Sequence, residues 1–301
     1  MQKNMQNPDL SEFIDRHRLP ESYAMVAQQW FSPVVEKIAV ESKKTGKTFI
    51  VGINGSQGSG KSTLADYLAL LLREKHQLNV VVLSIDDFYL SLKQRELLSK
   101  TIHPLLATRG VPGTHDIPMA LEVIRSLTEG TNRIRIPRFD TSVDDRCPED
   151  EWDTITSSTD AIILEGWCVG AVPQTENELL NDVNELEKEE DPDGAWRNYV
   201  NRRLGEVYQE LFNLVDYWIM LKAPSFDYVY QWRLEQENKL RSSLLNSPSA
   251  RENNKVMNED EVKRFIQHYQ RITEHLLNTL PENSDILFEL DENRNIFNAK
   301  S

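Results

Sequence analysis

The chain has 301 residues, of which 39% are hydrophobic and 27% charged, and this length allows one large α/β domain or two small ones. The formal net charge of −14 disfavours a nucleic-acid-binding surface and favours small-molecule chemistry. Only two cysteines, Cys147 and Cys168, are present, which excludes a disulfide framework. Residues 1–8 lack a signal-peptide core, and no run reaches the roughly 18 apolar residues of a membrane helix. We therefore expect a cytoplasmic protein with no membrane or nucleic-acid partner.

The N-terminal part of the chain alternates between helical and strand patterns. Apolar residues recur at helical spacing from residue 10 to residue 44, which predicts an N-terminal helical extension over residues 1–47. Thr48–Asn54 is an apolar run with β-branched residues and predicts a strand, after which Thr63–Lys75 returns to helical spacing. A second apolar run, Asn79–Ile85, follows directly. These segments predict a βαβ unit with parallel strands.

Three later apolar runs have the length and composition of buried strands, namely Ala161–Leu164, Tyr217–Leu221 and Asp285–Leu290. Helical stretches separate them. The segment 176–193 is strongly acidic and predicts a surface excursion rather than a domain linker. We therefore expect residues 48–301 to form one α/β domain with a doubly wound parallel sheet flanked by helices.

A glycine-rich loop joins the first predicted strand to the first predicted helix of this domain. Its pattern Gly-x-x-x-x-Gly-Lys-Ser is that of a P-loop NTPase, in which glycines let the backbone close around the β-phosphate. Lys61 reaches the β- and γ-phosphates, and the Ser62 hydroxyl can bind Mg²⁺. The alternative, a turn before an ordinary capped helix, is disfavoured by the flanking strand and helix. The predicted nucleotide-binding residues are Gly55, Ser56, Gln57, Gly58, Ser59, Gly60, Lys61, Ser62 and Thr63.

Two carboxylates follow neighbouring predicted strands. Asp86 comes directly after the second strand and is our candidate for the base, with the alternative that Asp86 and Asp87 cap the next helix. Glu165 ends the apolar run that begins at Ala161, which resembles a Walker B strand, and is our candidate for binding the metal with Ser62. The alternative for Glu165 is a solvated strand end. Lys61, Asp86 and Glu165 are thus the predicted catalytic groups beside the phosphates.

Two turn-rich loops between these strands mix cationic and acidic residues, and we expect them to bind the acceptor substrate. Taken singly, their side chains fit a loop-stabilising role as well, and the clustering favours the functional one. A helix after the fourth strand carries Arg233, in the position where nucleotide kinases have a lid arginine that neutralises transition-state charge. The predicted substrate-binding residues are Asp87, Tyr89, Arg109, His115, Asp116, Arg138 and Asp140.

These motifs, in this order, resemble the D-glycerate 3-kinase family. The resemblance is carried by the P-loop, by Ile85–Tyr89, by Arg109–Asp116, by Pro137–Asp140 and by Glu165–Trp167, and it covers roughly residues 48–297. It implies an ATP-dependent kinase that uses Mg²⁺ and phosphorylates D-glycerate to 3-phosphoglycerate.

A more distant similarity to uridine kinases, pantothenate kinases and phosphoribulokinases implies that Asp86, rather than Asp87, is the base. It also implies that Glu165 belongs to the metal and acceptor site. The sequence departs from the plant pattern at Thr141–Arg146, where that pattern has Lys-Ser followed by Gly-Arg-Gly-Asp-Arg.

Other functions are compatible with the same loop. One is a kinase for a nucleoside or a pantothenate-like acceptor, and another is an ATP- or GTP-hydrolysing switch or assembly factor. A GTP-specific switch is disfavoured because the sequence contains no Asn-Lys-x-Asp motif to read guanine. A binding module without turnover is the remaining alternative. The oligomeric state is left open by the sequence.

Overall fold

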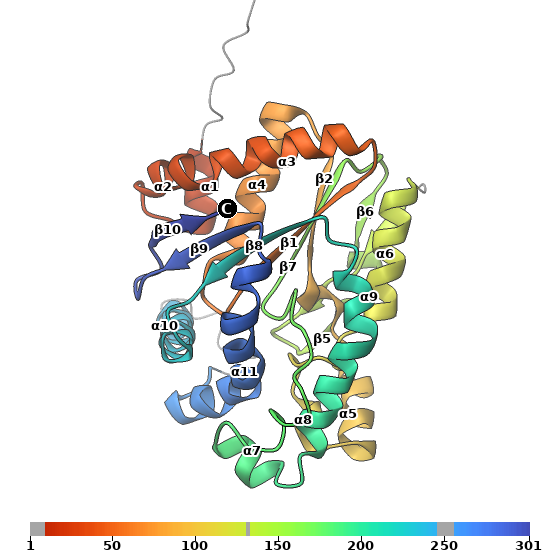
Figure 1. Cartoon of the computed structure of the whole chain (residues 1–301), viewed down its shortest axis with the longest axis vertical. Helices are drawn as coiled ribbons and strands as arrows, with labels where there is room; N and C mark the ends of the chain where they lie inside the picture. The colour runs from red at the N-terminus through yellow and green to blue at the C-terminus, as the bar shows by residue number, and fades with distance from the viewer. Residues whose placement is uncertain (1–9, 131–132, 246–255) are drawn as a thin grey trace, which may run out of the picture.

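The structure of the protein is a computed structural model that describes residues 10–130, 133–245 and 256–301. Within these residues a six-stranded sheet forms the centre of the molecule, in the order β10-β9-β8-β1-β7-β2 (Figure 1). All neighbouring pairs are parallel except the last hairpin, in which β10 runs antiparallel to β9. The strands are β1 (Phe49–Gly55), β2 (Val80–Ser84), β7 (Ala161–Gly166), β8 (Tyr217–Lys222), β9 (Ile286–Leu290) and β10 (Ile296–Lys300).

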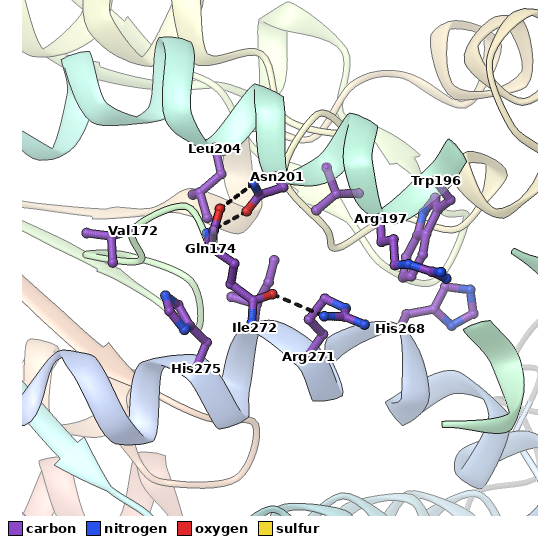
Figure 2. Close-up of a pocket in the computed structure, with 11 residues that line it drawn as sticks. Val172, Gln174, Trp196, Arg197, Asn201, Leu204, His268, Arg271, Ile272 and His275 are labelled. Carbon is purple, nitrogen blue, oxygen red and sulfur yellow. Dashed lines mark hydrogen bonds between the residues drawn. The ribbon is translucent and has the colours of Figure 1, made fainter. Parts of the chain in front are cut away.

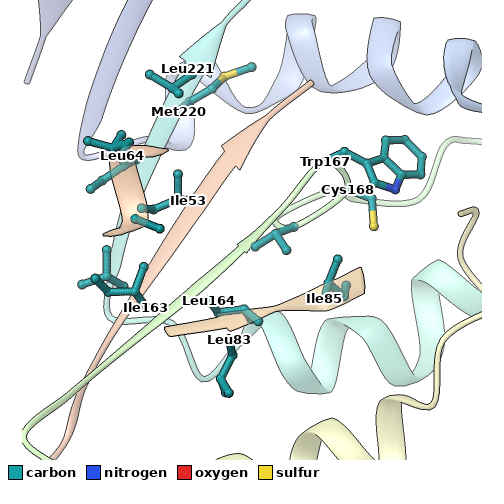
Figure 3. Packing of buried hydrophobic residues seen from close by; sticks show 14 of the residues in the cluster. Ile53, Leu64, Leu83, Ile85, Ile163, Leu164, Trp167, Cys168, Met220 and Leu221 are labelled. Carbon is teal, nitrogen blue, oxygen red and sulfur yellow. The ribbon is translucent and has the colours of Figure 1, made fainter. Parts of the chain in front are cut away.

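The chain winds outward from β1 in both directions, as expected for a doubly wound sheet. It first forms β2 and β7 on one side of β1, and later forms β8 and β9 on the other. Every residue of β1 and β7 is buried, because helices cover both faces of the sheet and the apolar runs suit that environment. Figure 3 shows Ile53, Ile163 and Leu83 of three neighbouring strands in this core. The predicted α/β class is confirmed.

Helices pack around the sheet, and two small two-stranded antiparallel sheets lie apart from it. Figure 1 shows α1–α3 at one end of the molecule and α5, α7 and α8 at the opposite end. The small sheets are β3 (Ile134–Ile136) with β6 (Asp153–Ile155), and β4 (Phe139–Asp140) with β5 (Asp145–Arg146). The helices are α1 (Ser11–His17), α2 (Tyr23–Trp30), α3 (Ser32–Thr45), α4 (Lys61–His76), α5 (Leu92–Thr101), α6 (Ile117–Glu129), α7 (Glu185–Glu190), α8 (Ala195–Arg203), α9 (Gln209–Phe212), α10 (Phe226–Leu245) and α11 (Glu259–Thr279).

The N-terminal helices share the core of the sheet domain. The buried ring of Phe31 lies 5.8 Å from that of Tyr67 on α4 and 5.4 Å from that of Phe288 on β9. Residues 1–9 of the predicted extension lie outside the described residues, and the division at residue 47 stays a prediction. No helix in the described part of the chain is long and apolar enough to cross a membrane.

The acidic segment 176–193 is more than the surface excursion that its charge predicts. Glu187 and Asp191 are completely buried. Glu187 accepts two hydrogen bonds from Arg271 of α11, at 2.7 and 2.6 Å, and Asp191 lies 3.2 Å from a guanidinium nitrogen of Arg197 on α8. The expectation was wrong for these two residues because one of their partners lies 84 positions away, where no local charge pattern reveals it.

Candidate active site

The P-loop lies between β1 and α4, at the carboxyl edge of the sheet. Gly58 and Gly60 have φ angles of +78° and +90°, which L side chains rarely adopt, and a Cβ on Gly55 would lie 2.4 Å from Ser59 Oγ. Helix α4 begins without a side-chain cap, because Gly60 occupies the cap position. The first backbone N–H groups of a 16-residue helix are therefore free to bind an anion.

Several polar atoms of the loop have no partner within the described residues. Ser56 Oγ, Gln57 Oε1 and Ser59 Oγ are all buried, and none forms a hydrogen bond. Buried polar groups are nearly always satisfied, so that each exception points to something else at the position. A loop that closes around the phosphates of a nucleotide has this property. Thr63 lies in the first turn of α4.

Glu165 lies beside the P-loop at the end of β7. In the sheet it is in register with Ile53 of β1 and Ser84 of β2, and only 5% of its surface is exposed. Ser62 Oγ donates a hydrogen bond to Glu165 Oε1 over 3.0 Å, and Lys61 Nζ lies 3.8 Å from Oε2. Burial raises the pKa of Glu165, and the Lys61 ammonium opposes that shift. The alternative of a solvated strand end is wrong.

Asp86 lies in the short 3-10 helix Ile85–Phe88 that follows β2. Its Oδ1 accepts a hydrogen bond from the Tyr89 hydroxyl over 2.8 Å. The helix-cap alternative is wrong for α5, because Ser91 caps that helix in a capping box with Gln94. Asp86 is half-buried and has its second oxygen free of hydrogen bonds from the residues that the structure describes.

Asp87 and Arg138, both predicted to bind the substrate, form an ion pair with each other. An Arg138 guanidinium nitrogen lies 2.6 Å from Asp87 Oδ2, and Arg138 Nε donates to Asp153 over 3.0 Å. Burial raises the pKa of Asp87, and the guanidinium of Arg138 opposes that shift. The pair fixes the turn after β2 to the β4–β5 hairpin.

Tyr89 and His115 lie in a small aromatic cluster. Their rings stack with centroids 4.5 Å apart, and His115 Nδ1 lies 2.7 Å from the hydroxyl oxygen of Tyr208. His115 is buried, and burial lowers its pKa to about 3, which keeps the imidazole neutral at physiological pH.

Two other predicted substrate residues hold local structure. Asp116 caps α6 by accepting a hydrogen bond from Met119 N over 3.2 Å, and its other oxygen lies 3.3 Å from Arg146. Asp140 accepts hydrogen bonds from the backbone N–H and the hydroxyl of Ser142, at 2.8 and 2.6 Å. Both geometries favour the loop-stabilising interpretation.

Arg109 offers more to a ligand than Arg138, the other arginine among the predicted substrate-binding residues. One guanidinium nitrogen bonds to Asp144, and the group lies 5.7 Å from the centre of the Phe139 ring. Its Nε and second terminal nitrogen have no partner in the described part of the chain. Arg109 also acts electrostatically on Tyr89, as does Asp86, which places these groups around one site.

Arg233 lies on α10, which packs directly against the P-loop. A Cβ on Gly58 would lie 2.8 Å from Cβ of Trp232, the neighbour of Arg233 in the chain. Arg233 itself forms an ion pair of 2.7 Å with the buried Glu237 and lies over the ring of Phe265. The predicted lid arginine is therefore beside the nucleotide loop, with its charge held by a carboxylate of its own helix.

Sequence reasoning missed several residues of this site. Tyr269 on α11 donates a hydrogen bond to the carbonyl of Arg109 over 3.0 Å, and its ring packs edge-on against Trp167. It occupies the space that a Cβ on Gly110 would need. Its only signal in the sequence is a buried position on an amphipathic helix. Asp144, the partner of Arg109, lies in the stretch where the chain departs from the plant pattern.

Two cavities differ in their relation to the loop. One, of about 440 Å³, lies beyond the carboxyl ends of β8 and β9, and Glu292 on its wall accepts a hydrogen bond of 2.8 Å from Trp232, which packs on Gly58. The other is an enclosed pocket between α8 and α11, lined by Trp196 and His268 (Figure 2). Its volume of about 10 Å³ has room for one water molecule, and no predicted site residue lines it.

Comparisons with known proteins agree with this geometry. The chain is 34% identical to the uncharacterised kinase mug58 of Schizosaccharomyces pombe over 276 residues, 87% of this chain and 94% of that protein. It is 30% identical to chloroplastic D-glycerate 3-kinase of Arabidopsis thaliana over 266 residues, 82% of this chain and about half (53%) of that protein.

The solved structure of D-glycerate 3-kinase from Cryptococcus neoformans has the same fold, with a TM-score of 0.72 at 24% identity over 92% of this chain and 99% of that one. No family model matches the chain. The shared length with mug58 and the P-loop site decide the class of enzyme. The chain belongs to the family of P-loop kinases that includes mug58, and it is a phosphotransferase with an alcohol group as acceptor.

Proposed function

We propose that the protein transfers the γ-phosphoryl group of ATP to a hydroxyl of D-glycerate and so forms 3-phosphoglycerate. The observation that carries the proposal is the position of Asp86. Its carboxylate follows β2 beside the P-loop and Glu165, with one oxygen available to a substrate hydroxyl. The relatives named above support D-glycerate as the acceptor.

The donor half of the site is built for a magnesium nucleotide. The Ser62 hydroxyl and the Glu165 carboxylate supply oxygen ligands, and Glu165 Oε2 is a buried atom without a hydrogen bond. In the described residues no cluster of three or more histidines, cysteines or acids could hold a metal alone. This donor set fits Mg²⁺, which prefers oxygen and shares its ligands with substrate phosphates and water. When bound, Mg²⁺ neutralises charge on the phosphates.

The 440 Å³ cavity is the proposed site of the nucleoside. Its wall includes Tyr228, Pro224 and the carbonyl-bearing turn at Glu292, and Trp232 connects that turn to Gly58 of the P-loop. Apolar residues such as Leu290 and Phe297 share the wall with charged ones such as Lys222 and Asp291, so a purine base could stack on the first and form hydrogen bonds to the second. The triphosphate then extends from this cavity along the loop toward Lys61.

The chemistry is mainly positional. The loop amides and Lys61 hold the phosphates, and Asp86 Oδ2 takes the proton of the acceptor hydroxyl. The oxygen of the acceptor then attacks the γ-phosphorus as the bond between that phosphorus and ADP breaks. Arg233 leaves its ion pair with Glu237 and interacts with the negative charge of the phosphoryl group during transfer. The proton on Asp86 leaves to solvent with the product.

Arg109 is the proposed anchor for the acceptor carboxylate. All three guanidinium nitrogens of Arg138 bond to Asp87 or Asp153, whereas Arg109 bonds to Asp144 through one nitrogen and has two without a partner among the described residues. Arg109→Met is expected to raise the KM for D-glycerate at least tenfold, on the order of the loss of one charge-assisted contact, and to leave the KM for ATP unchanged. An unchanged KM for D-glycerate would show that another residue binds the carboxylate of the acceptor.

The direct test is a coupled assay of ADP release with purified protein and Mg-ATP. The acceptor panel contains D-glycerate, L-glycerate, pantothenate, uridine and ribulose 5-phosphate. Stimulation by D-glycerate above the others is expected, and Asp86→Asn is expected to abolish it while nucleotide binding persists. Stimulation by another acceptor would support a kinase activity with that compound as the substrate. Full turnover in the Asp86 variant would contradict the assignment of Asp86 as the base.

A further inference from the structure

The side chain of Tyr89 contacts Asp86, the candidate base. Its hydroxyl donates a hydrogen bond of 2.8 Å to Asp86 Oδ1, and only 4% of the residue is exposed. Of the two Asp86 oxygens, Oδ1 is thereby occupied, and Oδ2 accepts no hydrogen bond from the part of the chain that the structure describes. One hydroxyl thus distinguishes the two oxygens of the candidate base.

The ring of Tyr89 is held on two sides. His115 stacks on it at 4.5 Å with an angle of 23° between the planes, and Phe139 meets it edge-on at 5.1 Å. The backbones of Tyr89 and His115 also form an antiparallel bridge. A ring fixed in this way has few alternative positions for its hydroxyl. The direction of the bond to Asp86 is therefore set by the core and does not depend on a substrate.

Tyr208 holds His115 in place. Gly113 N donates to the Tyr208 oxygen over 2.8 Å, and His115 Nδ1 lies 2.7 Å from the same oxygen, so one hydrogen bond joins the two side chains. Burial lowers the pKa of His115 to about 3, so the ring that supports Tyr89 stays neutral across the pH range of an assay.

We propose that Tyr89 is the positioning residue of the base, whose hydroxyl fixes Asp86 so that Oδ2 faces the acceptor hydroxyl. This inference rests on the proposed function, and it gives Tyr89 a role other than the substrate contact that the sequence predicts.

Other groups face Asp86, and they could also shape a pH profile. The titratable groups that interact electrostatically with Asp86 are Asp87 on the same turn, Tyr89, Glu165 at the end of β7, Cys168 after it and Tyr269 on α11. Lys61 forms an ion pair with Glu165. Among the described residues only Tyr89 donates a side-chain hydrogen bond to Asp86, so a change confined to the Tyr89 hydroxyl reports on Asp86.

The test is Tyr89→Phe in the full-length protein, which removes the hydroxyl and keeps the stacked ring. We expect kcat to fall roughly ten- to hundredfold, the range for a hydrogen bond to a charged group, with the KM for ATP unchanged. The acidic limb of the profile of kcat against pH is expected to move to higher pH, since the charged carboxylate loses a donor. A purely structural role would lower activity without moving that limb.

The matched control is Tyr217→Phe, which removes a hydroxyl at the start of β8, where the ring lies 6.4 Å from that of Phe49 at the end of β1 opposite the P-loop. It is expected to leave kcat and the pH profile unchanged. A Tyr89→Phe profile that matches the wild type would overturn the inference. If Asp86→Asn also keeps full turnover, the proposed base itself fails; if Asp86→Asn is inactive, only the role of Tyr89 fails.

A second measurement tests the same inference if Tyr89→Phe does not fold. Fluorotyrosine at position 89 keeps the ring and makes the hydroxyl a stronger donor. The acidic limb is then expected to move to lower pH, opposite to the direction for Tyr89→Phe. A shift in the same direction for both substitutions, or no shift for the fluorotyrosine protein, would contradict the inference.

Discussion

Ser62 and Glu165 lie 103 positions apart in the chain, yet the Ser62 hydroxyl donates a 3.0 Å hydrogen bond to the Glu165 carboxylate. The contact joins the start of α4 to the end of β7, across the carboxyl edge of the sheet. It brings two oxygen donors together beside the lysine of the P-loop. In the proposed function, this pair supplies the oxygen ligands of the protein for Mg²⁺.

Glu165→Gln is expected to lower kcat by roughly a hundredfold or more, because an amide keeps the hydrogen bond and loses the charge that holds Mg²⁺. The Mg²⁺ concentration for half-maximal activity should rise in parallel, which a titration of kcat against Mg²⁺ measures. Glu41→Gln on α3, where Glu41 pairs only with Lys37 and Lys44, is the control and should behave as wild type. An unaltered Mg²⁺ dependence in the Glu165 variant would remove this residue from the metal site.

Arg233→Gln is expected to reduce kcat by roughly a thousandfold, the scale for an arginine that neutralises a transferring phosphoryl group. The Kd for ATP should change little, since the charge acts mainly in the transition state. Single-turnover kinetics and calorimetry with ADP separate the two quantities. Arg241→Gln on the same helix, where Arg241 bonds to the Met257 carbonyl, provides the comparison. Equal effects of both substitutions would count against a specific role for Arg233.

Arg271→Met is expected to destabilise the protein by about 3–5 kcal/mol, because it leaves the charge of Glu187 buried without its partner. Replacing Glu187 by Leu in the same chain should restore most of that stability. Urea denaturation measures both variants. The matched control is Arg264→Met, also on α11, which breaks the exposed pair with Glu190 and should cost about 1 kcal/mol or less. Equal losses for the buried and exposed pairs would contradict the prediction.

His115 should make the fold less stable in acid. Its folded pKa is about 3, below the unfolded value near 6.5, so below pH 6.5 the unfolded chain binds a proton that the folded chain refuses. Between pH 6.5 and 4.5 this costs at most about 2.7 kcal/mol of unfolding free energy. His115→Phe should lack that increment, so its stability falls less over the same range, whatever its stability at pH 7. Parallel curves for wild type and variant would show that His115 is not the source.

The sequence predicts the features whose signals are local. Strands β1, β2, β7 and β8 are apolar runs buried on both faces, and the P-loop is a contiguous motif, so both can be read without knowledge of the fold. Asp86 and Glu165 follow from the same logic, because parallel strands bring their carboxyl ends to one edge.

The rest depends on contacts that no local pattern encodes. Tyr269 reaches Arg109 from a helix 160 positions away, and Glu187 finds Arg271 84 positions away. Asp116 has the residue type and setting of a ligand-binding acid, but both its oxygens are used by α6 and Arg146. The antiparallel β10 carries alternating, partly exposed residues and gives no strand signal comparable to that of the buried runs.

The order in which the strands are made has a consequence for synthesis of the protein. Strand β1, which delivers the P-loop, pairs with β7 and β8, whose residues leave the ribosome more than a hundred positions later. The nascent chain thus exposes an apolar strand and a glycine-rich loop until residue 222 has emerged. The proposed nucleoside cavity also needs β9 and Glu292, so ATP can stabilise the fold by mass action only when nearly the whole chain has been made.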